Sequence, residues 1–349
     1  MKKLIFKTAL FVAPFLILFY FSIPFTTIEK SDLSRLGYLL NKDYNYRILF
    51  KNEIAKPKRY VNISESNLKK RNNFDFLTIG DSFSEQGNLG YQNYLAKLSG
   101  KKVLHFDRFL HKNPLETIHG LLNGDVLNKI NVKYIILQSV ERSFVNRSKA
   151  VRKKHKITID WIQKSIQKPK NDIFTSSKPQ DFFTKAIFKF PLYNLYYNFD
   201  DNAFFSPVYK VKTKVNLFST NKNELLFFNE DLDNLKETNT KESVIRLNNE
   251  LNTIANRLKT KGITLIVLPC PDKFDFYYDN ILEKEKYTRP LFFNFLQDLP
   301  KDYLYVNSKK CLTEKSKNRK DIYFYDDTHW TPNACEIIAT EINDLVQKR

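Results

Sequence analysis

Two segments that are far apart in the sequence carry the side chains best suited to nucleophilic chemistry. The first is Gly80-Asp81-Ser82, which directly follows a short apolar run that begins at Phe74. A serine at the end of a buried strand presents its hydroxyl, but this hydroxyl is a weak nucleophile until a base takes its proton. The second segment, Asp326-Asp327-Thr328-His329-Trp330, holds an imidazole suited to act as that base near neutral pH.

His329 is the histidine with the most favourable neighbours. The other four lack an acidic residue in a comparable motif: His105, His111, His119 and His155. A carboxylate that accepts a hydrogen bond from one ring nitrogen fixes the tautomer of a catalytic histidine and stabilises its imidazolium. An extended loop would bring Asp327 to His329, whereas a turn would bring Asp326, so local spacing leaves both open.

Short apolar runs and amphipathic helices alternate around these two segments. Five runs are typical of buried strands, at about residues 74–79, 102–106, 134–137, 264–268 and 303–306. Helical stripes of apolar residues lie between them, and the last helix is predicted to begin near Thr331 and Pro332. This alternation predicts an α/β, flavodoxin-like fold of three layers with a mainly parallel five-stranded sheet and a site at the carboxyl ends of the strands.

The alternation stops between about residues 144 and 240, which are predicted to form an insertion above the sheet. The insertion begins basic and becomes rich in aromatic residues, including Phe182, Phe183, Phe188, Phe190 and Tyr193. These rings could form a lid or a groove wall that stacks on sugars, or they could fill the core of the insertion itself. Residues 28–72 are polar and irregular and are predicted to be a linker to a domain over residues 73–349.

The N-terminus combines lysines with an apolar stretch. Met1-Lys2-Lys3 precedes a run from Leu4 to Phe25 that only Lys7 interrupts. Its part from Thr8 to Phe25 is about long enough to cross a bilayer. No clear cleavage site follows, so residues 1–27 are predicted to be an uncleaved, single-pass signal anchor in the cytoplasmic (inner) membrane, with a removed signal peptide as the alternative. The leading lysines predict that the bulk of the chain lies in the periplasm or another extracytoplasmic space.

Composition narrows the classes of partner and cofactor. The formal charge is +19, from 57 Lys and Arg against 38 Asp and Glu, which favours anionic partners. The basic residues are spread along the chain, with short runs at residues 69–71 and 152–156, and no nucleic-acid signature accompanies them, so no nucleic-acid partner is predicted. Three cysteines lack metal-ligand spacing, and the sequence indicates no metal and no organic cofactor.

The Gly-Asp-Ser segment and the Asp-x-His-Trp segment together resemble the SGNH (GDSL-type) hydrolase superfamily. They look most like its branch related to alginate O-acetyltransferases, over about residues 74–142 and 243–345. Most of the superfamily resembles Asp-x-x-His, which would select Asp326. The acetyltransferase branch is similar to Asp-x-His-Trp, so the resemblance implies a triad of Ser82, His329 and Asp327.

The resemblance also suggests where a developing oxyanion would be stabilised. A typical member uses the serine N–H, a glycine N–H and an asparagine side chain after the third strand. Gly90 fits the glycine, but Gln138-Ser139-Val140-Glu141-Arg142 stands where the asparagine is expected. Gln138 or Arg142 could donate instead, and an ion pair between Glu141 and Arg142 is the structural alternative. The predicted oxyanion and substrate residues are Gly90, Gln138, Arg142 and Trp330.

The family resemblance implies an acyl-serine enzyme that moves an acetyl group to hydroxyls of an exported or cell-surface polysaccharide. In the resembled branch, a multi-pass membrane O-acyltransferase supplies the acyl group. Two alternatives remain at this point. One is a carbohydrate esterase with the same triad, and the other is a catalytically silent, membrane-tethered scaffold that binds glycan or an assembly partner.

Overall fold

A computed structural model of the chain describes residues 1–26, 31–39, 44–68, 72–167, 185–220, 222–317 and 319–348, without the side chains at 19, 22–26 and 185–188. Its centre is a six-stranded sheet in which every neighbouring pair is parallel. The strand order is β1-β4-β3-β6-β9-β10. The strands are β1 (Val61–Asn62), β3 (Phe76–Ile79), β4 (Val103–Phe106), β6 (Tyr134–Val140), β9 (Thr264–Cys270) and β10 (Leu304–Tyr305).

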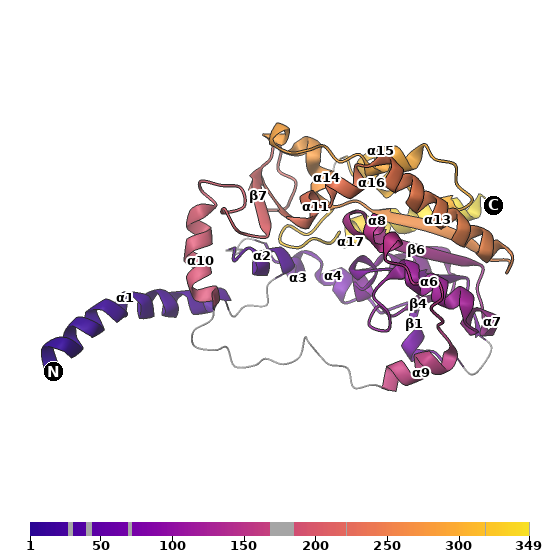
Figure 1. The fold of residues 1–349 in the computed structure, drawn as a ribbon, viewed down its shortest axis with the longest axis horizontal. Coiled ribbons are helices and arrows are strands. Elements are labelled where there is room, and N and C mark those ends of the chain that lie inside the picture. Colours follow the sequence, from indigo (N-terminus) through magenta and orange to yellow (C-terminus); the bar gives the residue numbers. More distant parts are fainter. Residues whose placement is uncertain are drawn as a thin grey trace.

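Helices cover both faces of this sheet, as Figure 1 shows. Alternate strand residues face opposite cores: Ile136 and Ile266 belong to one buried cluster, and Ile135 and Leu265 to the other. The first cluster is completed by α5 (Tyr91–Ser99), α16 (Ser308–Lys315) and α17 (Pro332–Gln347), and the second by α6 (Pro114–Asn123), α8 (Glu141–Lys149), α13 (Lys241–Lys259) and α15 (Phe292–Gln297). The predicted α/β fold with a parallel sheet is confirmed.

The prediction of five strands was one strand short. All five predicted runs form strands, and the sixth, β1, pairs with β4 at one edge through Val61 opposite Leu104. β1 consists of Val61 and Asn62, which do not belong to a continuous apolar run of the kind that marks the other strands. It lies within residues 28–72, which also contain the short helices α2 (Asp32–Leu36), α3 (Tyr46–Leu49) and α4 (Lys51–Ile54). Leu33 and Ile63 from this segment are fully buried.

The segment between α8 and α13 carries helices and a hairpin of its own. These are α9 (Ile159–Gln167), α10 (Lys185–Tyr196), the antiparallel pair β7 (Val208–Lys212) and β8 (Glu224–Phe228), α11 (Glu230–Asp233) and α12 (Leu235–Thr238). Phe190 and Tyr193 are buried, whereas Phe204 and Phe205 are 52% and 78% exposed. Some of the aromatic rings of this segment therefore fill a core, and others face solvent. Phe182, Phe183, the side chain of Phe188 and the basic run at residues 69–71 lie outside the described residues.

The shorter elements complete the chain order. They are β2 (Asn72–Asn73), which pairs with β5 (Ile130–Asn131), α7 (Val126–Lys129) and α14 (Lys273–Tyr277). Single 3-10 turns lie at η1 (Ile63–Glu65), η2 (Ser82–Ser84), η3 (Gly87–Leu89), η4 (Tyr278–Asn280) and η5 (Lys284–Lys286).

A helix forms at the N-terminus, α1 (Lys2–Thr26), and extends away from the sheet (Figure 1). The predicted transmembrane span is not found, because no helix within the described part of the chain is long and apolar enough to cross a membrane. Lys7 places a charged side chain within the apolar run of α1.

We expect Leu33→Ala to lower the free energy of unfolding by about 2–5 kcal/mol, because this fully buried side chain would leave a cavity in the core. Ile48→Ala is the matched control, since Ile48 is 72% exposed and its loss should change stability by less than about 0.5 kcal/mol. Denaturant unfolding measures both. Equal, small effects would show that residues 28–72 do not pack on the domain.

Candidate functional site

Ser82 lies at the carboxyl end of β3, a central strand of the sheet. The chain leaves the strand at Gly80, where an added Cβ would lie 2.1 Å from Ser84 Oγ and 2.4 Å from Gln138 Oε1. The absence of a side chain at Gly80 therefore allows the tight turn into η2. Asp81 caps this turn by accepting a hydrogen bond from the Phe83 N–H at 3.1 Å. Ser82 is left half-buried at the edge of the sheet.

A buried carboxylate, that of Asp81, ties this turn to the neighbouring strand and helix. Its Oδ1 also accepts from Gln138 Nε2 at 2.9 Å, and its Oδ2 accepts from the Val140 N–H at 2.8 Å and from Arg147 Nη1 at 2.5 Å. Burial alone would raise the pKa of Asp81, but Arg147 and these hydrogen bonds lower the pKa to about 2. Asp81 is therefore charged at neutral pH. Because Asp81 directly precedes Ser82, these bonds fix the backbone that leads into the serine.

The structure brings Asp327, not Asp326, to His329. Asp327 Oδ1 accepts from His329 Nδ1 at 2.5 Å and from the His329 N–H at 2.9 Å. The carbonyl of Asp326 instead accepts from the backbone N–H groups of Leu33 and Ser34, at the start of α2. The loop turns and bends over residues 325–329, and it is the carboxylate two residues before the histidine that reaches the ring.

Charged neighbours set the protonation of His329. Burial by itself lowers the pKa of an imidazole, but Asp327 outweighs burial and raises the pKa of His329, while the pKa of Asp327 is lowered in turn by its histidine. Asp32 raises the pKa of His329 further. The carboxylate of Asp32 is fixed by Thr328, whose N–H and hydroxyl donate to it at 2.9 and 2.6 Å.

The second ring nitrogen of His329 distinguishes it from His105 and His119. His105 and His119 also have acidic partners, Glu85 at 3.2 Å and Glu250 at 2.6 Å, and both of their ring nitrogens have polar contacts. In His329, Nδ1 faces Asp327, and Nε2 is buried without a hydrogen-bond partner in the described part of the chain. Only the latter arrangement leaves a nitrogen able to accept a proton from a substrate or a serine.

The turn that carries Ser82 contacts the loop that carries His329. The rings of Phe83 and His329 have centroids 4.8 Å apart, and Gln86 Nε2 donates to the carbonyl of Trp330 at 2.8 Å. No hydrogen bond joins Ser82 Oγ to His329 Nε2 among the described residues. The structure thus brings the two segments together without forming that bond.

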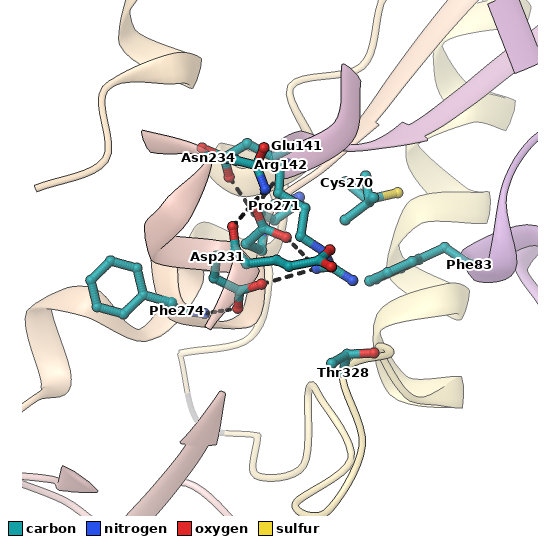
Figure 2. Close-up of polar contacts among 12 residues, drawn as sticks. Phe83, Glu141, Arg142, Asp231, Asn234, Cys270, Pro271, Phe274 and Thr328 are labelled. Carbon is teal, nitrogen blue, oxygen red and sulfur yellow. Dashed lines mark hydrogen bonds and ion pairs between the residues drawn. The ribbon is translucent and has the colours of Figure 1, made fainter. Parts of the chain in front are cut away.

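Arg142 is held beside these segments by carboxylates. Its Nη1 donates to Asp231 at 3.1 Å and to Asp272 at 2.5 Å, and its N–H donates to Asp272 at 2.8 Å. Arg142 does not pair with Glu141, whose carboxylate accepts from the Asp272 N–H. Figure 2 shows the guanidinium end of Arg142 directed toward Phe83. Arg142 also lowers the pKa of His329, so its charge acts at that ring.

The structure gives three predicted oxyanion and substrate residues other contacts. The Gly90 N–H donates to the carbonyl of Gly87 at 3.1 Å. Gln138 Nε2 donates to Asp81 and to Cys270 Sγ, and its Oε1 accepts from the Asp81 N–H and from Ser84 Oγ. Trp330 is fully buried, with its ring 5.3 Å from that of Phe83. These three residues hold the turn and the loop, which leaves Arg142 as the predicted donor with a side chain directed to the site.

A buried lysine that no sequence motif marks supports the loop of His329. Lys273 is fully buried, and its Nζ donates to the carbonyls of Phe324 and Tyr325 at 2.7 Å and of Asp327 at 3.2 Å. Burial lowers the pKa of Lys273 to about 7, although Asp326 and Asp327 oppose this shift. No motif marks such a residue, because its three partners are backbone groups that only the fold brings together.

A metal at this site would have to displace existing bonds. Asp32, Asp327 and His329 place ligand atoms within 4.8 Å of one another. Asp327 is already bonded to His329, however, and both oxygens of Asp32 accept from Thr328. The arrangement therefore serves a carboxylate–histidine pair with a free ring nitrogen.

Comparison with known proteins gives one match. Residues 221–349 match the family model of the SGNH hydrolase-like domain of acetyltransferase AlgX. This region includes Lys273, Asp327 and His329, and the resemblance predicted from the motifs is confirmed over it. No curated protein and no solved structure matches the chain significantly.

We expect Asp327→Asn to shift the pH dependence of any His329-dependent reaction. The neutral ring is the base, so the rate falls as the pH drops below the pKa of His329, which Asp327 raises. Its removal should move this acid limb to lower pH and reduce the rate at pH 8 by about a hundredfold or more, because the ring also loses its tautomer and orientation. The hydrolysis of a chromogenic acetyl ester, followed across about pH 5–9, measures the shift of the acid limb and the loss of rate. This pH range brackets the ordinary pKa of histidine.

Asp326→Asn is the control for this substitution, because the Asp326 side chain is not the partner of His329 Nδ1. It should leave the acid limb where it is in the wild type. If Asp326→Asn moves the limb and Asp327→Asn does not, the assignment of the orienting carboxylate is wrong.

We expect Lys273→Met to lower the free energy of unfolding by about 3 kcal/mol or more and the rate of ester hydrolysis by at least about tenfold. Three carbonyls would lose their donor in a buried place, and each orphaned group costs about 1–3 kcal/mol. Lys310→Met, at a side chain 65% exposed, is the control and should change neither quantity appreciably. Wild-type stability and activity in Lys273→Met would exclude a supporting role for this ammonium.

Proposed function

We propose that this protein is a polysaccharide O-acetyltransferase that works through an acetyl-serine at Ser82, with His329 as the base and Asp327 as its orienting carboxylate. The match of residues 221–349 to an SGNH hydrolase-like acetyltransferase domain supports the reaction class. The observation that carries the assignment of residues is His329 itself, bonded through Nδ1 to Asp327 and unpartnered at Nε2 beside the Ser82 turn.

The proposed reaction has two acyl-transfer steps. Ser82 Oγ attacks the acetyl carbonyl of the donor while His329 Nε2 takes the hydroxyl proton, and the leaving oxygen departs with that proton as the acetyl-serine forms. An acceptor hydroxyl then attacks the acetyl-serine and gives its proton to Nε2. When the second intermediate collapses, Ser82 Oγ takes the proton back, and the acetyl group has moved to the acceptor oxygen.

Arg142 is proposed to stabilise the negative oxygen in both steps. Burial by itself lowers the pKa of an arginine, but Asp272 and Asp231 outweigh it and raise the pKa of Arg142, so the guanidinium stays charged. Those carboxylates engage Nη1, and no hydrogen bond from Nη2 is found in the part of the chain that the structure describes. A charged donor that is already oriented needs little reorganisation when the oxyanion develops.

The matched family and the net charge of the chain support a proposal for the acceptor and the donor of the acetyl group. A polysaccharide acceptor is implied by the acetyltransferase family, and the net charge of +19 favours an acidic one. A multi-pass membrane O-acyltransferase is the proposed source of the acetyl group. An exported acceptor requires the domain to work outside the cytoplasm, which is part of this proposal.

The test compares wild type and Ser82→Ala, each given a chromogenic acetyl ester with and without oligosaccharides of an acidic surface polysaccharide. We expect acetylated oligosaccharide from the wild type, detected by mass spectrometry, and a loss of about a thousandfold or more in Ser82→Ala. Ser99→Ala is the control, because Ser99 Oγ donates to the Leu95 carbonyl within α5, away from this site.

Each other result contradicts a stated part of the proposal. Ser82-dependent release of acetate that sugar does not affect would identify a carbohydrate esterase. Equal activity in wild type and Ser82→Ala, or none in either when the membrane fraction that carries the acyl donor is added, would exclude the acyl-serine and favour a glycan-binding scaffold.

A further inference from the structure

Two histidines and a glutamate meet near the start of helix α6, where a returning segment of the chain crosses this helix. His111 precedes this helix, Glu116 lies in its first turn, and His155 belongs to a segment that returns across it. Gly120 allows this crossing, because an added Cβ would lie 2.6 Å from Ile157 Cγ1 and 3.0 Å from His155 Cδ2. The Ile157 N–H donates to the Gly120 carbonyl at 2.9 Å, so the crossing segment is fixed against the helix.

The ligand atoms of the three side chains converge. One atom from each lies within 4.8 Å of the other two, and His111 Nε2 is 3.5 Å from Glu116 Oε1. The side chains of His111 and Glu116 are 11% and 6% exposed. His155 Nε2 is buried, and no hydrogen-bond partner for it is found in the described part of the chain. A buried ring nitrogen without a partner is costly unless something occupies the space beside it.

The hydrogen bonds around His111 determine which of its nitrogens carries the proton. Thr117 Oγ1 donates to the Asn113 carbonyl at 2.9 Å, so its oxygen is free to accept from His111 Nδ1 at 3.0 Å. The Asn113 carbonyl, 3.2 Å away, is a second acceptor for the same N–H. Nε2 then presents a lone pair to the carboxylate of Glu116. Two acceptors at 3.5 Å are beyond hydrogen-bond distance and attract a cation between them.

We propose that His111, Glu116 and His155 bind a zinc ion. Tetrahedral zinc holds nitrogen and oxygen ligands at about 2.0–2.1 Å, which places two ligand atoms about 3.4 Å apart, close to the separation of His111 Nε2 and Glu116 Oε1. Two imidazoles and one carboxylate are a ligand set that suits zinc. The Nδ1–H of His111 would keep its bonds to Thr117 and Asn113, the usual support of a metal-bound imidazole. The rings of His111 and His155 are stacked with centroids 5.1 Å apart, so the ring of His155 must turn for its Nε2 to reach an ion shared with the other two ligands.

Nearby basic residues compete with the ion and are part of the test. Arg152 Nε donates to Glu116 Oε1 at 2.5 Å, but the arginine side chain is 72% exposed, where an ion pair contributes little. Zinc bound by Glu116 Oε1 would displace this arginine. Lys153 is directed to Glu250, to which it donates at 2.5 Å.

The metal would fasten the crossing segment, at the start of the insertion, to the helix that follows β4. This role does not depend on the acetyltransferase proposal, because none of the three ligands belongs to the Ser82, His329 and Asp327 group. Its test therefore has a readout in metal binding and not in activity.

The experiment titrates metal-stripped full-length protein with zinc against a chromogenic chelator, and with cobalt in the visible region. We expect one zinc per chain, tetrahedral cobalt bands, and a loss of affinity of about a hundredfold or more in His111→Ala and His155→Ala, with a smaller loss in Glu116→Gln. Arg152→Ala should bind zinc as tightly as the wild type or more tightly. Circular dichroism shows whether each variant is folded.

His329→Ala separates this site from the grouping of Asp32, Asp327 and His329. It should keep the wild-type affinity for zinc. No zinc bound by the folded wild type, unchanged affinity in the His111 and His155 variants, or loss of zinc in His329→Ala alone would each overturn the proposal.

Discussion

The position of Ser82 depends on the buried carboxylate of Asp81. It receives hydrogen bonds from the turn itself, from β6 through Gln138 and Val140, and from α8 through Arg147. A buried charge is stable only when its hydrogen-bonding capacity is filled, and four donors achieve this here. The same bonds that keep Asp81 ionised therefore fix the backbone of the following residue relative to two other elements. The serine is placed by the sheet and not by its own loop.

The loop of His329 is held in a different way, by a cation and a helix terminus. Lys273 reaches three of its carbonyls from one side, and the first N–H groups of α2 reach the Asp326 carbonyl from the other. Asp32 adds the bonds to Thr328. The loop thus needs both α2 and the start of α14, although these are separated by more than half of the chain. Its geometry is a property of the assembled domain.

This dependence explains what the sequence could and could not predict. The apolar runs of β3, β6 and β9 are local signals, so the parallel sheet was predictable, and the Asp-x-His-Trp motif selected the carboxylate that lies on His329. β1, Lys273 and Asp32 act through partners distant in sequence, and no local pattern marks them. Trp330 shows the converse. Its place in a motif suggested a substrate contact, whereas the fold uses it as a core residue against Phe83.

Neighbouring charges have two opposed effects on the pKa of His329. Asp327 and Asp32 stabilise positive charge on His329, which makes the ring a stronger base, while Arg142 opposes it from the other side. By lowering the pKa of His329, the positive charge of Arg142 makes the ring a weaker base. In the proposed reaction, nucleophilic attack would move negative charge onto a carbonyl oxygen, and the charged guanidinium would stabilise that oxygen. Asp231 and Asp272 hold Arg142 in that place before substrate arrives, so a large part of the cost of orienting it is met during folding.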